Sequence, residues 1–490
     1  MSVPHHQRMH FDLSARARQE MIHDGFDPEF PPDAAQQALL PAPPPVDTGA
    51  LRDLRGLLWS SIDNRESRDL DQIEVAERLA NGHIRLLVGI ADVDGLVPKG
   101  SPIDLHAAQN CCSVYTGVVV FPLLPEELST NRTSLLPDRE RDAVVIEMEI
   151  DEDGGVANHA IYRARTRNFA QLGYEDVGEW LDGAAPMPER VAHAGGMEAQ
   201  IRLQNEVAHR LLGRRQRDGA LEFETVEARP VVEEGRITDL RVPRKNPARL
   251  MIENFMIAAN TTMARYLEDR SIGSIQRIVR SPQRWPRIVE IAQRYGESLP
   301  AEADSLALSR FLSGRRAADP ERFPDLSLSI VKLMGPGEYT VVKSAAEHVG
   351  HFGLAVYSYT HSTAPNRRYA DLIVQRAVKA ALAGAPAPYS DDSLAAIAAR
   401  CTEREDAARK VERFMRKAVS AVWMHERIGD MFDAIVTGVS LKGTYVRVLK
   451  PPVEGRVVRG EHGLDVGDHT RVRLIGTDPE RGFIDFEEAS

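Results

Sequence analysis

The spacing of apolar residues predicts β-hairpins in the first half of the chain. Around Ile73 and Val75, apolar and polar positions alternate, and Asn81-Gly82 is typical of a type I′ turn before a mostly apolar return strand. The same pattern predicts further hairpins over residues 144–167 and 228–242, each turning at an acidic segment that contains glycine. We therefore expect this part of the chain to build a sheet from hairpins.

Helical periodicity replaces the alternation in the second half. We expect helices over residues 247–269, 365–382 and 390–428, the last with Ser390 as its N-cap. Residues 301–345 are less regular and contain several glycines and prolines. From Asp430 the chain returns to short strands separated by glycine turns, which is the pattern of a small five-stranded OB barrel.

These elements predict an α+β protein with two folded parts. Residues 49–428 would form a domain of mixed sheet hairpins packed with helices, and residues 430–490 a small all-β OB barrel. Residues 1–48 look like an N-terminal extension, with the folded part starting near Leu51. The reason is that the stretch Pro41–Pro45 is stiff polyproline, which can join neither helix nor sheet.

Composition excludes several classes of protein. With 43% hydrophobic and 27% charged residues, the chain can bury a core and is not disordered. No apolar run approaches the roughly 20 residues that span a bilayer, and the N-terminus lacks an apolar signal segment, so we expect no membrane association. Cys111, Cys112 and Cys401 are too few for a disulfide framework and indicate a reducing, cytoplasmic setting.

The charge balance bears on the class of partner. The chain has 61 basic and 72 acidic residues, a formal net charge of −11. This counts against a protein that coats nucleic acid through bulk charge. It does not exclude an enzyme that keeps its positive charge inside a channel and its acids at a metal site.

Candidate metal ligands occur in the stretch SIDNRESRDLDQIEV, which contains Asp63, Asp69 and Asp71. If Asp69 and Asp71 stand at a strand start, the period of two places both carboxylates on one face, and the polar NRES segment lets Asp63 fold back towards them. Converging carboxylates are costly unless a cation neutralises them, and hard oxygen ligands select Mg²⁺ or Mn²⁺. The alternative is a solvated, acid-rich turn, which the D-x-D spacing alone would favour.

Candidate phosphate ligands occur in the stretch Ala364-Pro365-Asn366-Arg367-Arg368-Tyr369. Pro365 is expected to open a helix, which places both arginines in its first turn, where cations oppose the helix dipole. They are tolerable there if an anion docks at the helix N-terminus, and phosphate is the common anion. The alternative is that both arginines lie on the surface or pair with Asp371.

Two further features have simpler explanations, which the pattern alone favours. Residues Arg409–Lys417 are strongly basic, and a solvated helix face with Glu412 in an i,i+4 ion pair accounts for them. Tyr115, Tyr174 and Phe223 can stack bases, but each is by itself typical of core or turn packing.

Taken together, these stretches resemble the catalytic RNB domain of the ribonuclease II/R family. The resemblance rests on SIDNRESRDLDQ with the strand LLVGIADV, then SVYTGVVVFPLLPEELS, MIENFMIAAN and HFGLAVYSYTHSTAPNRRYADLIVQR, in the family's order. The tail resembles the S-one OB barrel that these enzymes carry at the C-terminus. The resemblance spans about Leu51 to Phe486 and assigns the RNB domain to residues 49–428.

The resemblance implies a processive 3′→5′ hydrolytic exoribonuclease that uses Mg²⁺ and releases nucleoside 5′-monophosphates from single-stranded RNA. Asp63 and Asp71 would hold Mg²⁺ with the scissile phosphate, and Asp69 would complete the acidic shell and orient the attacking water. Gln72 falls where the family has a fourth aspartate and keeps an oxygen donor for the metal. Arg367 matches the family's essential arginine and would stabilise charge on the phosphate.

The resemblance also implies further site residues. Glu412 matches the family's glutamate on the long helix before the barrel, and it would belong to the catalytic set. Tyr115 matches the stacking tyrosine and would pack against the terminal nucleotide, with Tyr174 as a second aromatic. Arg368 and Tyr369 are candidates for additional RNA contacts. Protein partners cannot be identified from the sequence.

The chain departs from the family pattern in three places. Gln72 replaces an aspartate, Ala364-Pro365-Asn366 replaces Ser-Pro-Ile, and Gln375 replaces a histidine. A runner-up function is therefore an RNA-binding protein with a catalytically weakened RNB domain. A third is a metal phosphodiesterase that acts on small nucleotides.

The family usually carries two cold-shock OB domains ahead of the catalytic domain, each of roughly 60 residues. Asp63 stands too near the start of the chain to leave room for two such domains, and we do not expect even one. An enzyme without them is expected to have a wider entrance, weaker and less salt-sensitive RNA binding, and lower processivity.

Overall fold

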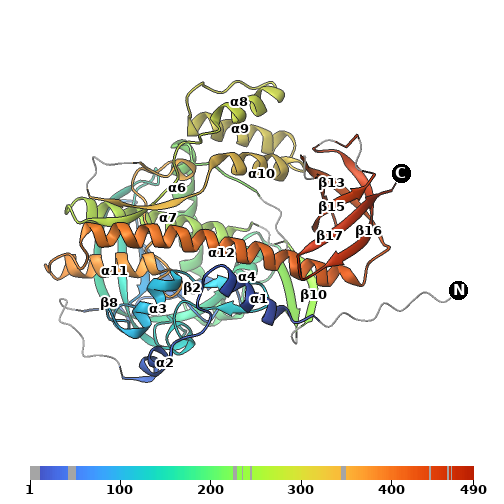
Figure 1. Cartoon of the computed structure of the whole chain (residues 1–490). Helices are drawn as coiled ribbons and strands as arrows, with labels where there is room; N and C mark the ends of the chain where they lie inside the picture. The colour runs from blue at the N-terminus through green and yellow to red at the C-terminus, as the bar shows by residue number, and fades with distance from the viewer. Residues whose placement is uncertain are drawn as a thin grey trace.

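The computed structural model describes residues 11–41, 51–224, 229–233, 236–242, 245–343, 349–440, 443–460, 463–464 and 466–489. Within these ranges a large α+β body is followed by a small β-barrel at the C-terminal end (Figure 1). This arrangement confirms the predicted fold class and the order of its two parts.

A six-stranded sheet forms the centre of the α+β body. Its strands are β1 (Arg52–Asp53), β2 (Trp59–Asp63), β3 (Gln72–Arg78), β4 (Ile84–Ala91), β7 (Glu140–Ile150) and β8 (Val156–Gly173). They lie in the order β1-β8-β2-β3-β4-β7, and β8 also pairs with β7, so the sheet curls back on itself. The β3–β4 and β7–β8 pairs are antiparallel, which confirms the first two predicted hairpins.

The turn between β3 and β4 differs from the predicted type I′. The Gly82 N–H donates to the Leu79 carbonyl, and the Leu79 N–H donates to the His83 carbonyl. Gly82 has a φ of +84°, but Asn81 does not have the positive φ that a type I′ turn also requires. The loop is therefore longer than a two-residue turn, and only Gly82 takes the left-handed conformation. The Asn81 side chain instead accepts a hydrogen bond from the His83 N–H at 3.0 Å.

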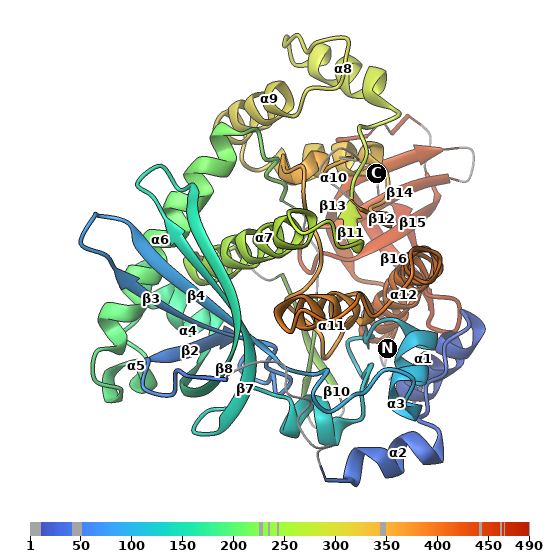
Figure 2. The ribbon, with the colours of Figure 1, turned by 90° about the vertical axis from the view of Figure 1, so that its left-hand side faces the viewer.

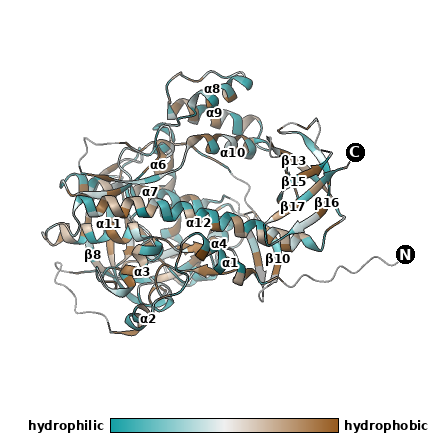
Figure 3. Cartoon of the chain, in the orientation of Figure 1, coloured by the Kyte–Doolittle hydropathy of each residue, from teal (hydrophilic) through white to brown (hydrophobic). Residues whose placement is uncertain are grey.

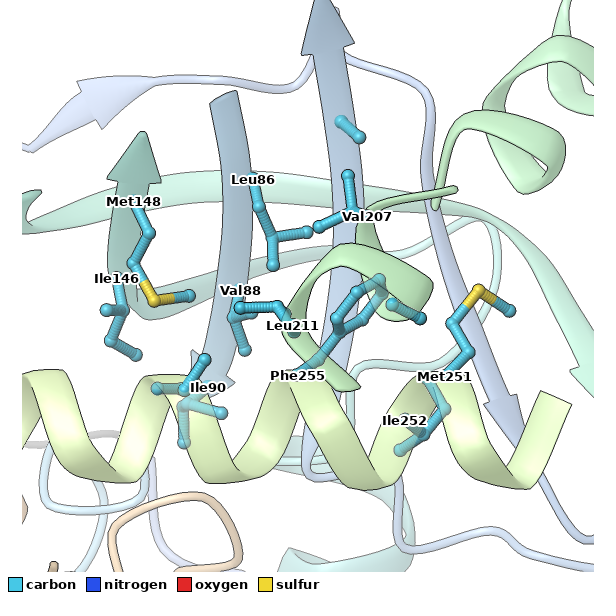
Figure 4. Close-up of a cluster of buried hydrophobic side chains, with 14 of the residues drawn as sticks. Leu86, Val88, Ile90, Ile146, Met148, Val207, Leu211, Met251, Ile252 and Phe255 are labelled. Atoms are coloured by element: carbon cyan, nitrogen blue, oxygen red, sulfur yellow. The ribbon is translucent and has the colours of Figure 1, made fainter. Parts of the chain in front are cut away.

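One face of the sheet packs against helices α4 (Tyr174–Leu181), α5 (Glu189–His193), α6 (Met197–Arg217) and α7 (Pro247–Glu268). Leu86, Val88 and Ile90 alternate along β4 and lie in one buried cluster with Val207 of α6 and Phe255 of α7 (Figure 4). Burying each such side chain stabilises the fold by about 1.5–3 kcal/mol relative to leaving it exposed. The observed α7 confirms the helix predicted for residues 247–269.

The opposite face of the sheet is covered as well. Helices α3 (Pro102–Asn110), α11 (Tyr369–Leu382) and α12 (Asp391–His425) share a second buried cluster with Ile73 and Val75 of β3. The Ser390 side chain caps α12 by accepting the Ser393 N–H, as predicted. Figure 2 shows the strands of the sheet on one side of α7 and α11 and the barrel on the other. Consequently, most of β3 is buried on both faces.

The irregular stretch within residues 301–345 is more ordered than its composition predicts. Strands β11 (Ser274–Ile278) and β12 (Glu338–Val342) pair antiparallel and enclose α8 (Trp285–Arg294), α9 (Ser305–Ala318) and α10 (Phe323–Met334). Asp304 caps α9 by accepting the Ala307 N–H, and a proline occupies the first turn of α10. Proline at that position starts a helix instead of breaking it, which explains why the prediction missed these helices.

A closed barrel follows α12. Its strands are β13 (Met431–Ser440), β14 (Gly443–Val448), β15 (Glu454–Arg459), β16 (His469–Asp478) and β17 (Phe483–Glu488). This confirms the predicted barrel of five strands. Val419, Ala421 and Met424 of α12 are buried in the same cluster as the barrel's own apolar residues.

The described strands that remain form two short hairpins. Strands β9 (Arg229–Glu233) and β10 (Arg236–Arg241) pair antiparallel and confirm the third predicted hairpin, whose turn at residues 234–235 lies outside the described residues. Strands β5 (Val114–Tyr115) and β6 (Val120–Phe121) form the other pair.

The N-terminal segment folds onto the rest of the molecule. Helices α1 (Leu13–His23) and α2 (Pro32–Leu39) carry fully buried residues, among them Ala17, Met21 and Ala34. The prediction that the folded part begins near Leu51 was therefore wrong. The polyproline stretch on which it relied lies mostly outside the described residues, and it follows two helices instead of replacing them.

Candidate active site

The connection from β2 to β3 carries the three predicted acids to one edge of the sheet. Asp63 is the last residue of β2, whereas Asp69 and Asp71 come just before β3 instead of lying within it. The Asp63 Oδ1 accepts the Asn64 N–H at 2.7 Å and the Ser67 hydroxyl at 3.1 Å. Burial raises the pKa of Asp63, while the Asn64 N–H and the nearby Arg367 charge act in the opposite direction.

Asp71 is the most enclosed of the three acids, at 1% exposure. Its Oδ1 accepts the backbone N–H of Asn366 at 2.9 Å, and its Oδ2 lies 3.4 Å from the Arg367 Nε. That Oδ2 forms no hydrogen bond with any residue that the structure describes. Burial raises the pKa of Asp71 to about 7, although Arg367 opposes the shift.

Arg367 lies in a turn and not in a helix, because α11 begins only at Tyr369. The Arg367 N–H donates to the Ala364 carbonyl, and the Arg367 carbonyl accepts the Ser113 N–H at 2.9 Å. The prediction that Pro365 opens the helix and places both arginines in its first turn was therefore wrong, because Arg368 is the N-cap of α11 and Arg367 precedes it. The turn and the β5 segment hold Arg367 next to Asp71, with its side chain 45% exposed.

Arg368 has a different role from its neighbour. Its Nε and Nη2 each lie 2.8 Å from the Asp371 carboxylate, which also accepts the Ala364 N–H at 2.8 Å. The alternative that an arginine pairs with Asp371 is thus confirmed for Arg368 only. This bidentate contact stabilises the turn that presents Arg367.

Tyr115 and Glu412 join this group from two other parts of the chain. The Tyr115 N–H donates to the Glu412 Oε1 at 3.1 Å, and the Tyr115 hydroxyl lies 3.4 Å from the Asp69 Oδ2. The Tyr115 side chain is 41% exposed, so its ring is accessible beside the acids. The structure therefore places the Tyr115 side chain beside Asp69 and ties its backbone to Glu412, whereas the catalytic roles of these residues stay predictions.

Comparison with protein families assigns the larger part of the chain. The model of the RNB domain matches residues 51–384, more than half of the chain. The chain belongs to the RNB family. In this RNB protein the barrel is of the S1 type, because the model of the RNase II-type exonuclease C-terminal S1 domain matches residues 430–489.

Individual relatives of the RNB domain agree with this assignment. Ribonuclease R 1 of Lactococcus lactis subsp. lactis (strain IL1403) is 31% identical over 492 residues, which cover 94% of this chain and 59% of that protein. The chain thus spans about three-fifths of the length of that curated relative.

Solved structures share the RNB fold. Mycoplasma genitalium RNase R in complex with ribose methylated single-stranded RNA has a TM-score of 0.86 at 22% identity, over 98% of this chain and 78% of that chain. Yeast Ssd1, a pseudonuclease, has a TM-score of 0.72 at 16% identity, over 91% of this chain and 56% of that chain. At these identities the likeness shows the fold alone.

Asp71 of this RNB site fits a divalent cation, on which nucleases of the family depend, although no three acids of the site bring their ligand atoms within 4.8 Å of one another among the described residues. The buried Asp71 Oδ2 has no hydrogen-bond partner among the described residues, and Asp63 and Asp69 face the same region. A buried oxygen without a donor is costly, and a hard cation satisfies it together with carboxylate neighbours. Gln72, at 5% exposure, begins β3 next to Asp71, and its role as a ligand stays a prediction.

The other predicted RNA-contacting side chains are less open. Tyr369 is 4% exposed and belongs to the buried cluster beneath the RNB sheet, which contradicts its predicted contact with RNA. Tyr174 begins α4, and the guanidinium of Arg249 lies 4.4 Å from the centre of its ring. Phe223 packs on the edge of the cluster around Trp285. The stacking role of Tyr174 therefore stays a prediction.

Glu74 was not predicted as a site residue. It is fully buried on β3, and neither carboxylate oxygen has a hydrogen-bond partner among the described residues. Burial and the charge of Asp63 raise its pKa well above the ordinary value. The alternation of apolar and polar residues around Glu74 is typical of a strand with one exposed face. It does not reveal that helices cover both faces of the sheet.

Within the described ranges of this RNB protein, none of the helices combines the length and the apolar character needed to cross a membrane.

Proposed function

We propose that this protein is a 3′→5′ exoribonuclease that hydrolyses single-stranded RNA to nucleoside 5′-monophosphates, with Mg²⁺ or Mn²⁺ as its metal ion. One observation carries the proposal: a single group of side chains places Asp71 3.4 Å from Arg367 and the Tyr115 hydroxyl 3.4 Å from Asp69. The cluster therefore offers ligands for a metal ion, a cation for a phosphate and a ring for a base. The relative named Ribonuclease R 1 supports the same activity.

Asp63, Asp69 and Asp71 are the residues that would hold the metal ion. When bound, a divalent ion in a phosphodiesterase site activates a water molecule and stabilises charge on the phosphate. Asp63 keeps its Oδ1 oriented through Asn64 and Ser67, and Asp71 keeps its Oδ1 oriented through Asn366. Their second oxygens are the ones that remain for a cation.

Arg367 is the residue that would bind the scissile phosphate. Its backbone is held on both sides, by Ala364 and by Ser113, so its guanidinium is positioned before substrate binds. A guanidinium presents several N–H donors, and the contact with Asp71, at 3.4 Å, involves Nε. The remaining donors can stabilise the negative charge that develops on the phosphate.

Tyr115 would stack on the base of the 3′-terminal nucleotide. Its ring is accessible, and its backbone is tied to α12 through Glu412. Stacking of a base on an aromatic side chain contributes about 1–3 kcal/mol and tolerates any sequence. We further propose that RNA is the partner and that the protein acts in the cytoplasm.

The test is degradation of RNA labelled at its 5′ end, with Mg²⁺ or with EDTA. The proposal expects shortening from the 3′ end and release of nucleoside 5′-monophosphates with Mg²⁺, and no reaction with EDTA. Hydrolysis of small nucleotides without degradation of long RNA would instead support a phosphodiesterase of small substrates.

A second candidate function is RNA binding without catalysis. It is favoured by Gln72, which offers a neutral ligand next to Asp71, and by the RNB fold of the pseudonuclease Ssd1. In the same assay this function would give a stable complex with intact RNA in the presence of Mg²⁺.

A further inference from the structure

The N-terminal segment packs directly beneath the hairpin that carries Tyr115. Ala17 and Met21 of α1 and the following Phe26 are at most 2% exposed. They share one buried cluster with Val114 and Phe121 of the β5–β6 hairpin and with apolar residues of α12. No residue of this segment belongs to the predicted catalytic or metal-binding set.

Strand alternation separates the two faces of that hairpin. Val114 is fully buried in the cluster, whereas the next residue, Tyr115, is 41% exposed and faces Asp69. Successive side chains on a strand point in opposite directions. The cluster therefore supports the backbone from below while the ring of Tyr115 stands above it at the site.

Polar contacts fix the segment in place on either side of the cluster. The Asp27 N–H donates to the Asn110 Oδ1 at 3.0 Å, and the Asn110 Nδ2 donates to the Asp27 carbonyl at 2.8 Å. Arg404 of α12 donates to the carbonyls of Asp24 at 3.0 Å and Gly25 at 2.6 Å.

Gly25 allows this close approach of Arg404. It has a φ of +82°, and a Cβ at this position would lie 2.8 Å from the Arg404 Nη1. A larger residue would therefore be strained and would also displace the guanidinium. The segment is thus built to lie against α12 and α3 in one orientation.

We propose that Phe26, together with α1, is a positioning residue for Tyr115 and that it determines how short an RNA the enzyme can still degrade. The proposal rests on the proposed exoribonuclease function. A long RNA has many contacts along the protein, but a product of a few nucleotides depends mainly on the stacking of its last bases. A displaced Tyr115 should therefore weaken the binding of the shortest substrates first.

The first test compares the end products of the wild-type protein with those of Phe26→Ala. Loss of the ring leaves a cavity beneath the hairpin, so Phe26→Ala should stop at longer oligonucleotides. Its KM for short oligonucleotides should rise by about tenfold, whereas kcat on long RNA should change much less. Phe26→Leu, which refills most of the cavity, should restore the short products.

The matched control is Leu211→Ala, which truncates an equally buried side chain of α6 in a different cluster. It should lower the melting temperature without changing the end product. If Phe26→Ala does not fold, Met21→Ala removes apolar volume from the same cluster and should shift the end product in the same direction.

The second test does not depend on activity. RNA with 2-aminopurine at its 3′ end is bound to Asp71→Asn protein, and stacking on Tyr115 should quench its fluorescence. Adding Phe26→Ala should reduce the quenching, and Tyr115→Ala is expected to do the same. Unchanged quenching together with unchanged end products would overturn the positioning role. If wild-type protein degrades no RNA, the proposed function itself fails, which is a separate result.

Discussion

Asp71 is held more closely than the other acids of the site. One of its oxygens accepts the Asn366 N–H, the other faces Arg367, and the side chain is almost completely buried. Asp63 and Asp69 keep partial exposure. A substitution at Asp71 therefore removes a charge from the interior of the site while leaving the surface unchanged.

Asp71→Asn should abolish most of the activity. The amide keeps the shape of the carboxylate but removes its charge, and we expect the rate to fall about 10³-fold, which corresponds to about 4 kcal/mol. RNA binding should persist, because repulsion between the carboxylate and the phosphate also falls. Single-turnover hydrolysis and fluorescence anisotropy measure the two effects separately. Wild-type turnover in this variant would contradict the assignment of Asp71.

The affinity for metal should depend on pH through Asp71. Burial raises its pKa to about 7 in the metal-free protein, so below that pH a cation must displace a proton. The affinity for Mn²⁺ should therefore fall about tenfold per pH unit below neutrality and level off above it. Calorimetric titration from about pH 6 to about pH 8 tests this. Asp71→Asn should lose the dependence, and a flat profile in the wild type would contradict the raised pKa.

At the scale of elements, α12 connects the site with the barrel. Glu412 contacts Tyr115, and Val419 and Met424 enter the barrel's core. On the same helix Lys410, Arg413 and Lys417 are exposed, and they form no ion pair within the part of the chain that the structure describes. Figure 3 shows hydrophilic residues along much of this helix. Like charges one turn apart weaken a helix, so an anion that lies along them would be stabilising.

Neutralising the three exposed cations of α12 should reduce the salt dependence of RNA binding. Each phosphate that a cation neutralises contributes about 0.7 to the slope of log K against log salt for single strands. The combined change of Lys410, Arg413 and Lys417 to Gln should therefore lower the slope by about 2. A control with the same charge change on exposed residues elsewhere uses Arg190, Arg294 and Arg310. If both proteins have equal slopes, Lys410, Arg413 and Lys417 do not bind RNA and belong to the solvated helix face that the sequence pattern favoured.

At the scale of the whole molecule, the barrel is not a detachable module. Arg447 of β14 lies 2.7 Å from Asp325 of α10, and the Arg16 Nε of α1 donates to the Glu480 carbonyl at 3.4 Å. The barrel's core also includes residues of α12. The domain boundary at residues 428–430 therefore separates two parts of the sequence, but those two parts pack against each other in the structure.

Truncation after Gly429 should affect stability as well as binding. It exposes Val419 and Met424, so we expect a lower melting temperature and a tendency to aggregate. Affinity for long RNA should fall strongly, while hydrolysis of short oligonucleotides should fall less. Calorimetry and turnover on both substrate lengths measure these effects. Equal losses for both lengths would mean that the barrel acts only through stability.

Local patterns in the sequence predicted a large part of this structure. The hairpins around β3–β4 and β7–β8, the helices α7 and α12, and the terminal barrel follow from alternation, periodicity and caps, each of which involves residues close in sequence. The acidic motif and Arg367 were singled out by their residue types, and their assignment to the site came from the resemblance to the ribonuclease II/R family. The hairpins, helices and barrel could be predicted because backbone conformation depends strongly on residues that are close in sequence.

Only the tertiary structure decided which of these residues are accessible and which are buried. The burial of Glu74 and Tyr369, the turn that holds Arg367, and the docking of Phe26 under the hairpin depend on segments far apart in the chain. Phe26 shares one buried cluster with residues of β5 and α12, and no periodicity within any single segment encodes such packing. The sequence by itself thus determined the elements and the chemistry of the motif, whereas packing between distant elements determined how the site is assembled.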